Sequence, residues 1–259
     1  MAALPNTPST GLQWFSEGMR SLRVPGTIAF SGVVIFYLLM SGLLAGLPLV
    51  GLLLASLWMP FGSVMTGFAA RDVLAGGRPA WGVLGQAWAQ KRLRLRLLGL
   101  GVVSAAGMQI VLIVFSLLSK DQLSKWVVTE QGVDAASIAG NIPYFGIAVS
   151  SLLYVPLLMA TVFAPLLLAD AGQTLGKSLF YSFFGVVKNF MPSVTAGLCV
   201  SLSALVCGTL TTALFALSPF LASFVAALLT ALLSMISQAM VWAMYRGIFG
   251  EKRLFGTIG

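Results

Sequence analysis

The sequence predicts an all-α protein, a polytopic transmembrane bundle of six helices in three hairpin-like units, with short amphipathic interfacial helices on the cytoplasmic side. Hydrophobic residues make up 58% of the 259 residues and charged residues 8%. This composition leaves too little polar surface to cover a water-soluble domain. The uncharged runs are also long enough to cross a bilayer, which takes about 20 apolar residues. The basic residues are concentrated in every second segment that connects the expected spans.

Four uncharged runs contain the six spans. The runs 24–70 and 189–245 are each long enough for two crossings, whereas 97–119 and 142–169 hold one each. We expect tight turns at Gly46–Pro48 and Ser218–Pro219 to divide the two long runs. All spans belong to a single integral membrane domain over 1–259, and they are 27–45, 49–69, 97–119, 145–169, 193–217 and 220–244.

The basic residues predict the orientation of the spans. With both termini in the cytoplasm, 13 of the 15 basic residues lie inside, as the positive-inside rule requires. The outside loop over 120–144 keeps only Lys120 and Lys125, beside Asp121, Glu130 and Asp134. The inside residues are Arg20, Arg23, Arg71, Arg78, Lys91, Arg92, Arg94, Arg96, Lys177, Lys188, Arg246, Lys252 and Arg253.

A segment with an apolar stripe precedes each pair of spans. The stripes have helical spacing and basic residues beside them, as in helices that lie in the membrane surface. The chain therefore consists of three similar units, each a surface helix followed by a transmembrane hairpin. The surface helices are either simple membrane anchors or lipid sensors. The stripes are Leu12, Phe15, Met19 and Leu22; Trp81, Leu84 and Trp88; and Leu179, Phe180, Phe183, Phe184 and Val187.

The spans contain amides, hydroxyls and thiols but no charge near their middles, which argues against proton or ion pathways. Small and polar residues recur every four positions on spans five and six, so the two helices can pack closely and exchange hydrogen bonds. A second interpretation is a polar groove in which Gln109 and Gln238 bind a head group or small solute. The candidate seam residues are Gln109, Cys199, Ser203, Cys207, Thr211, Thr230, Ser234 and Gln238.

Prolines interrupt two of the spans. Pro60 lies in span two, and Pro156 and Pro165 lie in span four. Each removes a helix hydrogen bond and is expected to kink the chain. The kinks serve packing alone or, as in transporters, mark a binding site.

The densest basic cluster directly precedes span three. Arg92 and Arg96 share one helix face there, while Arg94 points elsewhere. The cluster is a topology determinant, and it is also a candidate contact for anionic lipid head groups. Its members are Lys91, Arg92, Arg94 and Arg96.

Several classes of activity are disfavoured. Histidine is absent, so the commonest general base, haem ligand and metal ligand are missing; we expect no cofactor and no metal. Cys199 and Cys207 are about 12 Å apart along one helix, too far for a disulfide. Asp72 and Asp170 end spans two and four, where they can pair with Arg71 or Lys177, or face a partner. No acid and base lie together inside the membrane, so we expect no enzyme activity, and the dispersed basic residues predict no nucleic-acid partner.

Three stretches resemble an uncharacterised family of six-span bacterial inner-membrane proteins. They are 163–189, the segment Gly11-Leu-Gln-Trp-Phe15 and the segment Gly77-Arg78-Pro79. The resemblance implies an α-helical fold in the bacterial plasma membrane, and it carries over no catalytic residue.

The leading functional hypothesis is a non-enzymatic accessory or scaffold subunit of the bacterial inner membrane that packs against other membrane proteins and lipid. The alternative is a transporter or lipid-handling protein for an apolar or zwitterionic solute. A midplane cavity at the Pro60 and Pro156 kinks would favour the alternative.

Overall fold

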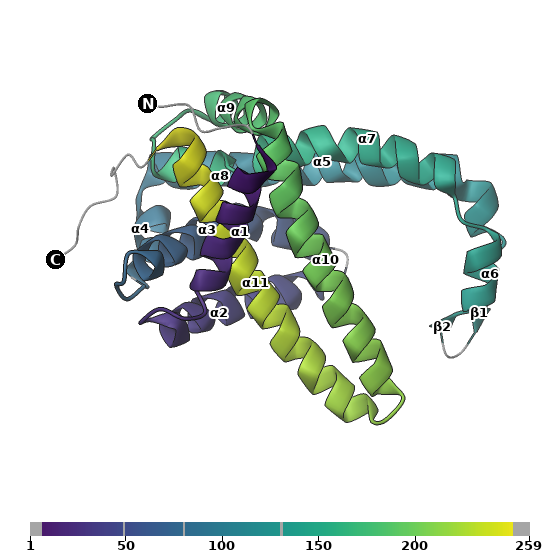
Figure 1. Ribbon diagram of the computed structural model, residues 1–259. Coiled ribbons are helices and arrows are strands. Elements are labelled where there is room, and N and C mark those ends of the chain that lie inside the picture. The colour runs from purple at the N-terminus through teal and green to yellow at the C-terminus, as the bar shows by residue number, and fades with distance from the viewer. Residues whose placement is uncertain (1–6, 49, 80, 130–131, 251–259) are drawn as a thin grey trace.

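The computed structural model describes residues 7–48, 50–79, 81–129 and 132–250, and these ranges are almost entirely helical (Figure 1). Leu49, Glu130, Lys252 and Arg253, on which some predictions above rest, lie outside them. A two-stranded antiparallel ladder pairs Val128 with Val133. The elements are α1 (Pro8–Arg20), α2 (Thr27–Ala45), α3 (Gly51–Leu74), α4 (Gly82–Ala89), α5 (Lys91–Leu123), β1 (Val128–Thr129), β2 (Gly132–Val133), α6 (Ala135–Gly140), α7 (Tyr144–Thr161), α8 (Ala164–Ala169), α9 (Leu175–Lys188), α10 (Phe190–Phe215) and α11 (Pro219–Phe249).

The predicted all-α bundle of six membrane-spanning helices is confirmed. Helices α2, α3, α5, α10 and α11, together with the consecutive pair α7 and α8, are long and apolar enough to cross a membrane. Several extend beyond the predicted spans, because a helix continues past the apolar region where its residues favour helix. Thus α5 begins at Lys91, not at residue 97, since lysine, arginine and leucine are good helix formers.

The six spans pair as three hairpins, α2–α3, α5–α7 and α10–α11. The hairpins meet at the end of the molecule that carries Arg71, Arg96 and Arg246, here called the basic end. Large buried side chains such as Phe68, Leu97 and Trp242 fill the core there. Toward the opposite end the α5–α7 and α10–α11 hairpins diverge (Figure 1), so much of their apolar surface is left uncovered.

The three predicted amphipathic helices are present as α1, α4 and α9. Helix α1 packs on α10 and α11, α4 on α3 and α5, and α9 on α7 and α8. Each of α4 and α9 therefore contacts the hairpin that precedes it in the chain. Helix α1 instead contacts α10 and α11, the hairpin farthest from it along the described chain.

The structure shows which faces of these helices pack against the rest of the protein. In α1 the buried residues include Gly11, Trp14 and Gly18, whereas Leu12 and Met19 of the predicted stripe are exposed. Small residues face the protein because they let helix backbones approach closely. Helix α9 repeats the arrangement with Ser178, Ser182 and Gly185 buried and Phe180 and Phe184 exposed. The large apolar side chains of these two helices are thus left on the outer surface of the protein.

The fourth span is broken in two, and a serine from α9 fills the break. Helix α7 ends at Thr161 and α8 begins at Ala164, with Pro165 in the first turn of α8. The Ser182 hydroxyl donates to the carbonyl of Met159 at 2.8 Å and accepts from the N–H of Phe163 at 3.1 Å. These two backbone groups would bond each other in a continuous helix. The hydroxyl therefore satisfies groups that would otherwise be buried without partners.

Replacing Ser182 by alanine is expected to lower the free energy of unfolding by about 1 kcal/mol, because both backbone groups lose their partner. Ser178→Ala is the matched control. Ser178 is equally buried, one turn earlier on α9, but its hydroxyl donates only within its own helix, to Leu175. Thermal denaturation in detergent micelles measures both variants, and equal losses of stability would contradict the role assigned to Ser182.

Candidate functional site

A cavity of about 170 Å³ lies where the three hairpins meet. It is called the central cavity here, and helices from all three hairpins line it. The described residues in its wall supply hydroxyl and amide groups, and none of them is Asp, Glu, Lys or Arg. The lining residues are Tyr37 of α2; Met59, Pro60, Ser63 and Gly67 of α3; Leu100 and Ser104 of α5; Leu158 and Thr161 of α7; Val162; Pro165 and Leu166 of α8; and Gln238 and Val241 of α11.

Two prolines help to create this space. Pro60 lies inside α3 and leaves the carbonyl of Ser56 without its helix donor. Gly101 of α5 packs against that carbonyl, so closely that an added Cβ would lie 2.9 Å from the oxygen. Pro165 begins α8 on the other side of the cavity. The prediction named Pro156 together with Pro60, but the cavity lies at Pro60 and Pro165.

Gln238 is the most versatile polar group in the wall. The Thr66 hydroxyl lies 2.8 Å from Gln238 Oε1, toward which it donates, and 2.9 Å from the carbonyl of Gly62. This bond orients the amide from α11 against α3. Within the part of the chain that the structure describes, the Nε2 group of Gln238 makes no hydrogen bond, so it can donate to a bound molecule.

The hydroxyls of Ser63 and Thr161 donate to their own helices, to Met59 at 2.9 Å and to Leu157 at 2.8 Å. Their oxygen lone pairs can still accept a hydrogen bond from a ligand. The sequence analysis missed these residues and Tyr37. Thr161 had a usable signal, since it lies four residues before Pro165 and its carbonyl is the one that this proline leaves free.

The polar wall lies at one depth. Three of its residues are eight positions from an arginine at the basic end, which is about 12 Å along a helix. The pairs are Ser63 and Arg71, Ser104 and Arg96, and Gln238 and Arg246. The cavity therefore lies closer to the basic end than to the other end of these helices.

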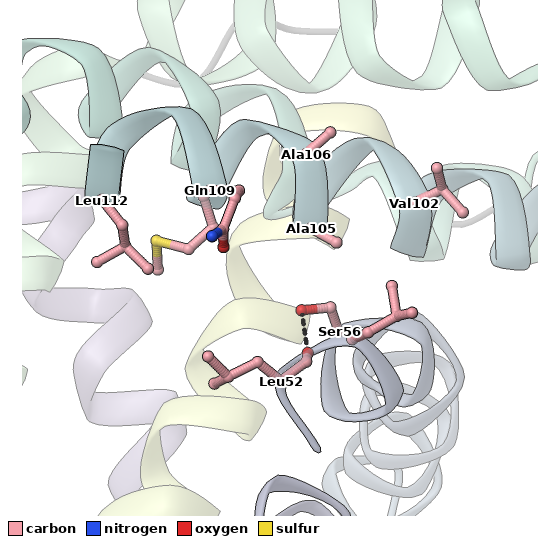
Figure 2. A pocket seen from close by; sticks show the side chains of 9 residues that line it. Leu52, Ser56, Val102, Ala105, Ala106, Gln109 and Leu112 are labelled. Carbon is pink, nitrogen blue, oxygen red and sulfur yellow. Dashed lines mark hydrogen bonds between the residues drawn. The ribbon is translucent and has the colours of Figure 1, made fainter. Parts of the chain in front are cut away.

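Gln109 lies in a different cavity. This groove between α3 and α5, of about 390 Å³, is apolar except for Ser56 and Gln109 (Figure 2). The α3–α5 groove is lined by Leu52, Leu53, Ser56, Val102, Ala105, Ala106, Met108, Gln109 and Leu112. The hypothesis that Gln109 and Gln238 share one polar groove is therefore wrong. Helices α3 and α5 touch at Ser56, Leu57 and Gly101, between the two cavities.

The chain matches no protein family, no curated protein and no solved structure.

The predicted seam residues of α10 and α11 lie as follows. Cys199, Ser203, Cys207 and Thr211 are half-buried along α10, which packs on α11. The hydroxyls of Ser203 and Thr211 donate to their own helix. On α11, Thr230 is exposed and Ser234 half-buried, while Gln238 points away from α10 toward Thr66 of α3. No hydrogen bond joins the two predicted stripes within the described residues.

The four basic residues at the start of α5 have different surroundings. Arg96 donates to the carbonyls of Gly172 at 3.1 Å and Gln173 at 2.9 Å. Arg94 donates to the carbonyl of Trp88 at 3.1 Å and lies over its ring. Lys91 and Arg92 are exposed, and Arg92 lines a cavity of about 380 Å³ beside Arg96. Lys91 and Arg92 are thus the members most available to a lipid head group.

The two aspartates at the basic end have different surroundings. Asp72 pairs with Arg71 at 2.9 Å, one of the pairings considered from the sequence. Asp170 is fully buried and accepts a hydrogen bond from the Tyr245 hydroxyl at 2.9 Å. The sequence analysis did not anticipate this contact, which ties the segment after α8 to the end of α11.

Proposed function

We propose that this protein is a non-enzymatic, lipid-handling membrane protein that binds a neutral, hydrogen-bonding amphiphile in the central cavity. The observation that carries the proposal is the uncharged but polar wall of this cavity, within the membrane-spanning region, beside Pro60 inside α3 and Pro165 at the break between α7 and α8. Polar groups inside membrane-spanning helices are costly to maintain and commonly mark binding sites or substrate pathways.

The chemistry of the wall limits the ligand. A charged group would enter the cavity without a counter-charge, at a large desolvation cost. A hydroxyl or amide group can instead accept from Gln238 Nε2 and donate to the oxygen of Ser63 or Thr161, and a carbonyl can accept from Gln238 Nε2. These residues therefore favour a neutral polar group.

The size of the cavity also limits the ligand. An apolar cavity of about 150 Å³ holds one benzene molecule, so about 170 Å³ holds one polar group of a lipid and the carbons around it. The rest of such a molecule would lie in the bilayer between the diverging α5–α7 and α10–α11 hairpins. The ligand is thus expected to carry its polar group about 12 Å deeper than the arginines of the basic end.

We place the protein in the bacterial inner membrane with the basic end and both termini in the cytoplasm. The arginines at that end support this orientation through the positive-inside rule. Exposed large apolar side chains on α1, α4 and α9, such as Leu12, Trp88 and Phe180, support contact of these helices with the membrane interface. Lys91 and Arg92 are the proposed contacts for anionic head groups there.

Purification from native membranes in a mild detergent, followed by mass spectrometry of bound lipids, tests the function. Wild-type protein is expected to retain one neutral amphiphile at a constant molar ratio. Gln238→Leu should lower its occupancy at limiting ligand about tenfold, because loss of one well-placed hydrogen bond costs about 1.4 kcal/mol. Thr230→Val, on the exposed side of α11, is the control and should retain the molecule.

The same lipid mixture on all three proteins, in the proportions of the membrane, would contradict the proposal. Melting temperatures of the variants show whether Gln238→Leu is still folded. A different membrane protein retained at constant stoichiometry, without an enriched amphiphile, would favour a second proposal, an accessory or scaffold subunit. The exposed apolar faces of α5 and α10 support that alternative.

A further inference from the structure

The amide of Gln109 lies where an unpaired polar group is energetically unfavourable, far from both ends of a membrane-spanning helix. It lies on α5 thirteen residues after Arg96 and eleven before Lys120, about 20 Å and 16 Å along the helix. This places it near the middle of the bilayer. The residue is exposed, and its side chain makes no hydrogen bond to any other residue in the described ranges. Hydrocarbon supplies no partner to such an amide, so a partner from outside the chain is favoured strongly.

The surroundings of Gln109 allow another helix to approach. Its amide projects into the α3–α5 groove between apolar side chains of both helices, with Ala105 and Ala106 one turn away on α5 (Figure 2). Small residues beside a polar side chain are typical of transmembrane helix contacts, because they permit close packing around the hydrogen bond.

The depth of Gln109 limits what can occupy the groove. A phospholipid of either leaflet places its head group and ester groups near the membrane surface and offers only hydrocarbon at mid-depth. A transmembrane helix with a polar side chain at that depth can hydrogen-bond the amide. A second copy of this chain fulfils the condition by symmetry, since a twofold axis along the membrane normal puts equivalent residues at equal depth.

We propose that two copies of the protein associate through their α3–α5 grooves, with the Gln109 amides of the two copies paired across the twofold axis. A carboxamide carries both donors and acceptors, so each amide can donate one hydrogen bond to the other and accept one in return. A twofold contact of this kind is self-complementary and closes at two subunits. The pairing does not use the central cavity, and its test is independent of the ligand proposed above.

Cysteine cross-linking in native membranes tests the proposal. Cys199 and Cys207 are first replaced by alanine, and Ala106→Cys then introduces a thiol in the groove that leaves Gln109 in place. We expect mild oxidation to give a disulfide-linked dimer. Leu205→Cys, at mid-length of α10 and exposed, is the control and should remain monomeric.

A second measurement isolates the amide. The dissociation constant of the dimer in liposomes, measured by energy transfer between labelled copies, is expected to rise at least about tenfold in Gln109→Leu. The same substitution should abolish the Ala106→Cys cross-link. Gln109→Asn keeps the amide, so this variant should dimerise more strongly than Gln109→Leu. If the contact depended on apolar packing alone, Gln109→Asn would dimerise no more strongly than Gln109→Leu.

Several results would overturn the proposal. Equal cross-linking at positions 106 and 205 would show random collision, and an unchanged dissociation constant in Gln109→Leu would show that the amide does not pair. A cross-link from position 106 to a protein of another mass would assign the groove to a different partner. A lipid bound by the wild type but not by Gln109→Leu, with both proteins monomeric, would assign it to lipid.

Discussion

Replacing Gly11 by alanine is expected to detach α1 from the α10–α11 hairpin and to lower the free energy of unfolding by about 3 kcal/mol. A Cβ at this position would overlap the carbonyl oxygen of Pro192 and lie 2.8 Å from the Cβ of Thr195. The obstacle is helix backbone, which cannot move aside as a flexible side chain can, so overpacking is costly here. The shift would also expose Trp14, which is 4% exposed in the folded protein.

Thermal denaturation in detergent measures the loss, and maleimide labelling of Thr10→Cys, in a background without Cys199 and Cys207, reports whether α1 has detached. The control is Gly197→Ala on α10, where an added Cβ meets nothing within 4 Å. That change should leave stability equal or slightly higher, because alanine favours helix over glycine. If both variants lost the same stability, the packing role of Gly11 would be refuted.

Replacing Tyr245 by phenylalanine is expected to lower the free energy of unfolding by about 2 kcal/mol. The hydroxyl donates to the fully buried carboxyl group of Asp170 at 2.9 Å, and removing a donor from a buried acidic group costs more than breaking an ordinary hydrogen bond. The ring itself keeps its contacts, because it packs against Trp242 and Phe249 at centroid distances of 5.4 Å each.

Chemical denaturation in mixed micelles, followed by tryptophan fluorescence, measures this change. Tyr181→Phe is the control, since that ring is partly exposed and lines the same 260 Å³ cavity beside Tyr245. We expect no measurable effect there. A Tyr245→Phe protein as stable as the wild type would mean that the hydrogen bond to Asp170 contributes nothing net to folding.

The positions of the spans could be predicted because the bilayer imposes a single requirement, a long apolar helix. Helix packing could not be predicted in the same way, because the side of a span that faces lipid and the side that faces protein are equally apolar. For this reason the stripe that includes Leu12 and Met19 did not indicate which residues of α1 pack on the α10–α11 hairpin, whereas the structure shows that Gly11 and Gly18 do.

The candidate site was predicted in part for a related reason. Pro60 and Gln238 were recognised because prolines and amides are unusual in a span. Which polar residues converge depends on helix rotation and crossing, and the repeat of four residues on α11 gave no sign that Gln238 faces Thr66 of α3. Likewise, nothing near Pro165 in sequence indicated that Ser182, on another helix, fills the break.

Because α1 packs on α10 and α11, it cannot reach its final position in the fold until those two helices have been made. Gly11 leaves the ribosome before Pro192, and at 5–20 residues per second the interval is roughly 10 to 35 seconds. During that time the glycine face of α1 has no docking partner, while the four spans between Gly11 and Pro192 are made. The exposed Leu12 and Met19 give α1 a second apolar face, through which it can bind the membrane surface until α10 and α11 are made. This contact is then completed when α10 and α11 have been made and pack against α1.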